Sequence, residues 1–179
     1  MAGTGRKGRY DSYDLDSSGA VPMIDIANTE VHLGLHWTAA TTQAGGSAVN
    51  VLITAPATLI YHFVAEVDVT GAAALVWSVN PNASGGSAIT SFNNNENSSN
   101  TSLLIHALAP TYVSSGTIIE TWYVGSATGN AGQPMILGGS SGLGREWTLG
   151  LSSVHLLRVE PAASCQTSIR MYYYRGGEV

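Results

Sequence analysis

Apolar and polar side chains alternate along most of the chain, which is the pattern of strands with one buried and one exposed face. In residues 59–68 every second side chain is apolar, namely Tyr61, Phe63, Ala65 and Val67. This pattern, together with β-branched and aromatic content between turn residues, predicts a series of strands. Their ranges are 29–37, 59–68, 73–79, 101–108, 117–124, 133–137, 145–149, 154–160 and 167–174.

No stretch shows the period of about 3.6 residues that marks an amphipathic helix. Parallel strands need long crossover connections, usually helices, so many short strands without helices predict antiparallel pairing. Such strands are buried either in two sheets packed face to face or in a closed barrel. We therefore expect an all-β fold, an antiparallel jelly-roll-like β-sandwich.

Residues 1–28 differ from the rest of the chain because they are rich in Gly, Ser and Asp and show neither period. We expect an extended N-terminal arm over 1–28 and one sandwich domain over 29–179. Residues 81–100 are a second irregular stretch, polar enough to lie on the surface as a functional loop.

The composition narrows the class of protein. The chain has 179 residues and a mass of 18.6 kDa, which suits one domain with a single core. Its net charge is −5 and it has only 7 Lys and Arg, too few to neutralise a phosphate backbone, so we expect no nucleic-acid partner. No apolar run is long enough to span a bilayer, so we expect no membrane partner either. With only 11% charged residues, the surface is expected to be covered largely by other protein.

Two short motifs resemble enzyme signatures. Gly3, Gly5 and Gly8 match the dinucleotide-binding pattern, but the strand before it and the helix after it that this pattern requires are not predicted. Ser140 lies in a G-x-S-x-G pattern with no predicted helix after it, which a glycine-rich loop produces by composition. Because no acid, base and nucleophile assemble at readable positions, we expect a non-enzymatic protein without a cofactor.

Two groups of residues have metal-ligand spacing. His32 and His36 are four residues apart, but on a strand this spacing separates them by about 13 Å, too far to share one ion. The ligand spacing of a calcium loop is matched by four residues of the arm, Asp14, Asp16, Ser18 and Asp25. The flanking helices of such a loop are missing, so calcium binding and a plain acidic turn both stay open, and we assign no metal site.

Several stretches, taken together, have the order and spacing of a known family. They are the sequence EVHLGLHW at 30–37, the Asn-rich stretch 88–101, the strand pair 145–149 and 154–159, and the aromatic stretch 169–174. From residue 29 to the C-terminus the chain resembles the β-sandwich decoration, or cement, proteins of tailed-bacteriophage capsids. The Asn-rich stretch is similar to a family loop of the pattern T-P-x-N-x-N-R-N-S, and Glu96 stands where that loop usually carries Arg.

The resemblance implies a homotrimer on the outer surface of the capsid, made in the host cytoplasm and carried on the virion. Its partner would be the major capsid protein, whose subunit contacts it would stabilise. We expect the arm to bind the capsid through basic and aromatic side chains, namely Arg6, Lys7, Arg9, Tyr10 and Tyr13. A contact at a subunit junction is expected for the loop residues Asn93, Asn94, Asn95, Glu96 and Asn97. The amides of this loop can satisfy backbone groups that no strand ladder pairs.

A carbohydrate-binding head-fibre or receptor-binding domain is the alternative function, because aromatic rings and Asn side chains on a β-sandwich also suit sugars. The candidate rings are Trp77, Trp122 and Tyr172 to Tyr174. Most of them lie in alternating strands, which favours packing in the core or between subunits over a sugar platform.

Overall fold

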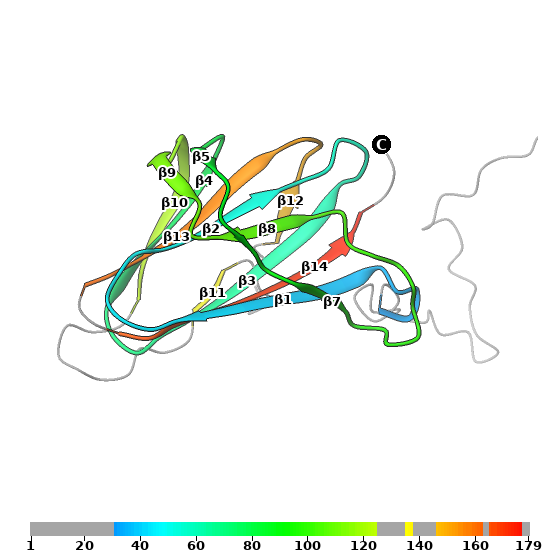
Figure 1. Cartoon of the computed structure of the whole chain (residues 1–179), viewed down its shortest axis with the longest axis horizontal. Coiled ribbons are helices and arrows are strands. Elements are labelled where there is room, and N and C mark those ends of the chain that lie inside the picture. The colour runs from blue at the N-terminus through cyan, green and yellow to red at the C-terminus, as the bar shows by residue number, and fades with distance from the viewer. Residues whose placement is uncertain (1–30, 125–134, 138–145, 163–164, 177–179) are drawn as a thin grey trace, which may run out of the picture.

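The computed structural model describes residues 31–124, 135–137, 146–162 and 165–176, and all of its regular elements are strands. Two six-stranded sheets face each other, and a small two-stranded sheet accompanies them (Figure 1). Every pair of neighbouring strands is antiparallel. The predicted all-β, antiparallel sandwich is therefore confirmed.

The first sheet has the order β11, β3, β14, β1, β7, and β12 also pairs with β3. β11 and β12 pair with successive stretches of β3, so both lie on its outer edge. The bounds of these strands are β1 His36–Gln43, β3 Tyr61–Val69, β7 Ser91–Asn93, β11 Met135–Leu137, β12 Trp147–Leu149 and β14 Thr167–Arg175.

The second sheet has the order β10, β4, β13, β2, β8, β6, and the small sheet pairs β5 with β9. The bounds in the second sheet are β2 Val49–Thr54, β4 Ala73–Val79, β6 Ser87–Ala88, β8 Ile105–Leu108, β10 Thr117–Val124 and β13 Val154–Pro161. In the small sheet they are β5 Asn82–Ser84 and β9 Thr111–Ser114.

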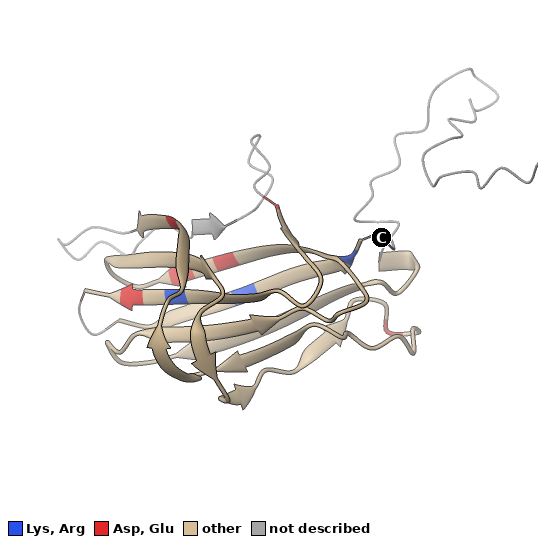
Figure 2. Ribbon diagram, turned by 90° about the horizontal axis from the view of Figure 1, so that it is seen from above, with Lys and Arg blue, Asp and Glu red and all other residues tan. Residues whose placement is uncertain are grey.

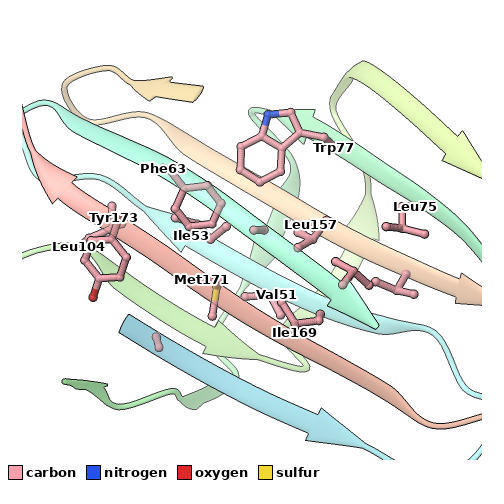
Figure 3. Close-up of a cluster of buried hydrophobic side chains, with 14 of the residues drawn as sticks. Val51, Ile53, Phe63, Leu75, Trp77, Leu104, Leu157, Ile169, Met171 and Tyr173 are labelled. Atoms are coloured by element: carbon pink, nitrogen blue, oxygen red, sulfur yellow. The ribbon is translucent and has the colours of Figure 1, made fainter. Parts of the chain in front are cut away.

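The core lies between the two large sheets because the strands keep the predicted alternation. Along β3 every second residue from Tyr61 to Val69 is buried, and the residues between them are half-buried on the outer face. Side chains from both sheets, among them Phe63, Trp77 and Tyr173, point into the space between the layers (Figure 3). Burying a large apolar side chain of this kind contributes about 1.5 to 3 kcal/mol.

The small sheet lies over the outer face of the second large sheet. Tyr112 of β9 places its ring 4.5 Å from the guanidinium carbon of Arg158 on β13. Leu156 and Ser78 are cross-strand partners that alternate with core residues, so they point away from the space between the large sheets, yet both are fully buried. Part of the second sheet is therefore covered on both faces.

The structure corrects the first predicted strand, 29–37. Val31 and His32 are helical, Leu33 and Gly34 form a turn in which the Gly34 N–H donates to the Val31 carbonyl, and the strand β1 begins only at His36. Gly34 has a φ of +66°, a backbone conformation that is unfavourable for residues with a Cβ atom. This conformation also differs from that of a strand, so the regular strand cannot extend through Gly34. Leu33, expected on the buried face, is 48% exposed, whereas Trp37 is buried as expected.

Other strand boundaries differ as well. β2 and β9 were not predicted, and the irregular stretch 81–100 contains the short strands β5, β6 and β7. The predicted strand 101–108 is regular only from Ile105, and 145–149 only from Trp147. The arm 1–28, the motif at Ser140, and residues 133, 134 and 145 lie outside the described residues, so the predictions made for them stay predictions.

Candidate functional site

The predicted loop residues lie in an asparagine-rich turn, residues 93–100, that is hydrogen-bonded to residues 32–38. Asn93 Nδ2 donates to the carbonyl oxygens of Gly34, at 2.9 Å, and Asn100, at 3.0 Å. Asn95 Nδ2 donates to the His32 carbonyl at 3.0 Å, and Asn100 Nδ2 donates to the Leu33 carbonyl at 3.3 Å. Side chains of the turn thus satisfy carbonyl groups that belong to no strand ladder.

Asn94 connects the turn to the strand β1. Its Nδ2 lies 2.7 Å from Nδ1 of His36, and its Oδ1 accepts the hydroxyl of Thr38 at 2.8 Å. Burial lowers the pKa of His36 below its usual value, which favours the neutral imidazole that can accept from an amide. The turn and the strand are therefore joined by side chains as well as by the β1–β7 ladder.

Local hydrogen bonds fix the shape of the turn itself. The Asn95 N–H donates to Oδ1 of Asn93 at 2.9 Å, and the Asn97 N–H donates to Oδ1 of Asn95 at 3.0 Å. These are Asx turns, in which a side chain replaces the carbonyl of an ordinary turn. The Asn100 N–H donates in the same way to Oγ of Ser98 at 3.1 Å. The prediction that asparagine side chains satisfy backbone groups is confirmed for Asn93 and Asn95, whereas Asn94 bonds to other side chains.

Gly34 allows the two segments to approach each other. A Cβ atom on Gly34 would overlap both Cβ and Oγ of Ser98. Because any side chain at this position would push the turn away, Gly34 is required for the hydrogen bonds that Asn93 and Asn95 make to its neighbourhood.

Exposed apolar side chains border the turn. Leu33 is 48% exposed and Leu103 is 49% exposed. Leu103 also lines a pocket of about 310 Å³ at this end of the sandwich. The pocket is also lined by the apolar or aromatic residues Leu35, Trp37, Leu59 and Tyr61 and by the polar residues Ser99, Asn100, Thr101 and Arg175. We call the turn, Leu33, Leu103 and the pocket the asparagine end of the molecule.

Of the five predicted loop residues, Asn93 and Asn95 are half-buried, and Asn94, Glu96 and Asn97 are exposed. In the part of the chain that is described, the side chain of Asn97 makes no hydrogen bond, in contrast to that of Asn95. The predicted arm residues Arg6, Lys7, Arg9, Tyr10 and Tyr13 lie outside the described residues. The leucines at the turn were missed, because Leu33 was assigned to a buried strand face.

Three of the five rings considered for a sugar platform are covered within the chain. Trp77 and Tyr173 are buried in the core. Tyr174 is stacked between His62, at 4.7 Å between ring centroids, and His36, at 6.2 Å. A sugar packs on the face of an aromatic ring, and both faces of Tyr174 are already covered by imidazoles. Its hydroxyl donates to Glu146 at 2.7 Å, so its polar atom is also engaged.

The described residues, with the arm and four shorter segments left out, contain no group of three or more His, Cys, Asp or Glu that could hold a metal ion. Nor do they include a helix long and apolar enough to cross a membrane. The positions of charged residues are sparse along the described part of the ribbon (Figure 2). Arg170 of β14, for example, pairs with Glu66 at 3.1 Å and with Asp68 at 2.9 Å, both on β3.

Comparison of the chain with models of protein families, with curated proteins and with solved structures found no match.

Proposed function

We propose that this chain is a capsid decoration protein, a non-enzymatic virion protein that binds the major capsid protein on the outer surface of a tailed-phage head. The proposal rests on the resemblance of residues 29–179 to that family. The observation that carries it furthest is the asparagine end, where a hydrogen-bonded polar turn presents Leu33 and Leu103 to the outside.

A turn that is held in shape by the side chains of Asn93, Asn95 and Asn100 within its own chain is suited to docking as a preformed unit. Ordering a loop on binding costs free energy, and a loop that is already fixed avoids that cost. The exposed leucines supply the apolar area that most protein contacts bury at their centre, and the asparagines around them supply a polar rim. The asparagine end therefore has the composition of a protein-binding surface.

The low number of charged residues also favours a protein partner over a nucleic acid. Phosphate and nucleic-acid partners require clustered cations, whereas the described residues carry single arginines, two of them paired with acidic groups. A capsid offers many copies of one surface. A protein that binds the assembled shell better than its free subunits stabilises the shell by mass action, and repetition over the lattice multiplies the effect.

The proposal is tested by co-expressing the chain with the major capsid protein of the same genome and sedimenting the assembled shells. We expect the wild-type chain to sediment with the shells. The double variant Leu33→Lys, Leu103→Lys should remain in the supernatant, because it places two charges in the contact. Val113→Lys is the control, since Val113 is 68% exposed and lies on β9 of the small sheet, far from β7 and the asparagine end (Figure 1). A wild-type chain that never sediments with intact shells would overturn the proposal.

A further inference from the structure

The pocket at the asparagine end lies where the described part of the chain begins. The short segment that leads from Val31 into β1 includes Leu35, which lines the pocket. The carbonyl of Leu33 in this segment accepts the side chain of Asn100, another lining residue, at 3.3 Å. Residues 1–30 lie outside the described residues, so they join the molecule next to this pocket.

The pocket has a size and a lining that suit a few apolar side chains. Its volume of about 310 Å³ is at the lower end of the roughly 300 to 1,000 Å³ that ligand pockets span. The lining includes the aliphatic side chains of Leu35, Leu59 and Leu103 and the aromatic residues Trp37 and Tyr61. Because Leu103 is 49% exposed, a segment that packs on it removes apolar surface from water.

One stretch within residues 1–30 matches that lining. These residues are mostly Gly, Ser, Asp and basic or aromatic residues, but residues 21–26 have the sequence VPMIDI, the densest apolar run among them. In an extended segment alternate side chains share a face, so Ile24 and Ile26 point to one side and Asp25 to the other. Ile26 precedes Val31 by five residues, which span up to about 17 Å, so the segment can turn back to the pocket.

We propose that residues 21–26 pack into the pocket of their own chain, with Ile24 and Ile26 against its leucines. This segment is favoured over a separate ligand because it is attached at Val31, beside the pocket. A short tether of this kind gives an effective concentration in the millimolar range. The segment also supplies the apolar side chains that the lining lacks a partner for among the described residues. The arm therefore closes this end of the sandwich.

Thiol labelling of the free, full-length chain tests this placement. The thiol of the variant Ile24→Cys should react with N-ethylmaleimide at least about tenfold more slowly than that of Leu15→Cys, because Leu15 lies in the arm outside the segment. Peptide mapping separates each new thiol from that of Cys165, and the two new thiols should react alike in urea. Equal rates in the folded chain would overturn the inference. They would leave the capsid proposal standing, because no capsid is present in the assay.

Further variants show whether the pocket provides the protection. Adding Leu103→Lys, which puts a charge in the lining, should make Ile24→Cys react as fast as Leu15→Cys. Adding Val113→Lys should leave it slow, because Val113 lies on β9. With no new thiol, the double variant Ile24→Ser, Ile26→Ser should melt about 3 to 10 °C below the wild type, whereas Leu15→Ser should melt like the wild type. Protection that survives Leu103→Lys, or an unchanged melting midpoint of the double variant, would show that the segment does not occupy the pocket.

Discussion

The stability of the protein should fall in mild acid because His106 is buried without a charge partner. His106 lies on β8 and is 1% exposed. Its ring packs against Tyr173, at 4.9 Å between centroids, and Phe63, at 6.4 Å, and its Nδ1 lies 3.5 Å from Oγ of Ser91. Burial lowers the pKa of His106 from 6.5 to about 4. The folded protein therefore holds this imidazole neutral at a pH where the unfolded chain protonates it.

The direction of the effect follows from which state binds more protons. Between pH 6.5 and pH 4 the unfolded chain binds a proton at His106 and the folded chain does not, so the free energy of unfolding falls as the pH falls through this window. A pKa difference of about 2.5 units corresponds to about 3 kcal/mol in total, of which about 2 kcal/mol is lost by pH 5. That is a large part of the stability of a typical domain.

Urea unfolding of the wild type and of His106→Phe at pH 7.5 and pH 5.0 measures how much His106 contributes to the loss of stability in acid. Phe keeps an aromatic ring in the core but cannot bind a proton, so the variant should lose about 2 kcal/mol less than the wild type between the two pH values. Any constant cost of the substitution cancels in this difference. Met171→Leu is the control, because it also changes a buried core side chain but no titratable group, so its cost should be the same at both pH values. Equal losses for His106→Phe and the wild type would refute the reasoning.

Three further predictions concern the asparagine end and the arm. Gly34→Ala should destabilise the protein by more than about 1 kcal/mol in urea unfolding, because its Cβ overlaps Ser98, whereas Gly45→Ala, at φ +87° with open space around it, should show only the smaller cost of its backbone conformation. Asn95→Ala should destabilise the protein by about 1 to 3 kcal/mol in thermal melting, because it removes the partners of the His32 carbonyl and the Asn97 N–H. Asn97→Ala, the control, should destabilise it by under about 0.5 kcal/mol, and equal effects of the two variants would show that Asn95 does not hold the turn. Deleting residues 1–28 should weaken shell binding in the sedimentation assay, and unchanged binding would show that the arm is not an anchor.

The sequence predicted β3 and β10 well because each has one face toward the core and a more exposed outer face, and it predicted β4 well although Leu75 to Ser78 are all buried. β4 and β10 have the predicted ends, and the buried set of β3 is the predicted one. β2 was missed because Val51, Leu52 and Ile53 are all buried, so its sequence has no alternation to read. Leu52 points to the outer face of the second sheet, part of which is covered. The residues that cover this outer face are distant in sequence, as the contact of Tyr112 with Arg158 shows. The pattern of hydrophobic and polar residues within one strand cannot predict such contacts.

The sequence predicted which side chains of the candidate site would form hydrogen bonds, but not which backbone groups they would bond to. A run of asparagines indicates Asx turns, and the bonds from Asn93 to Asn95 and from Asn95 to Asn97 are of this kind. The acceptors at Gly34 and His32 lie about sixty residues earlier in the chain, and only the antiparallel pairing of β1 with β7 brings them to the turn. The positive φ of Gly34 is the local feature that interrupts the expected strand, and the sequence EVHLGLHW, which alternates across it, gave no sign of that break.

An electron cryo-microscopy map of intact particles from the source of this sequence tests the central claim most directly. The account predicts density for the β-sandwich at regular positions on the outer surface of the capsid, with residues 93–100 and Leu33 against the major capsid protein. Density for the chain at the tail or at a fibre end, or a capsid surface without it, would contradict the account.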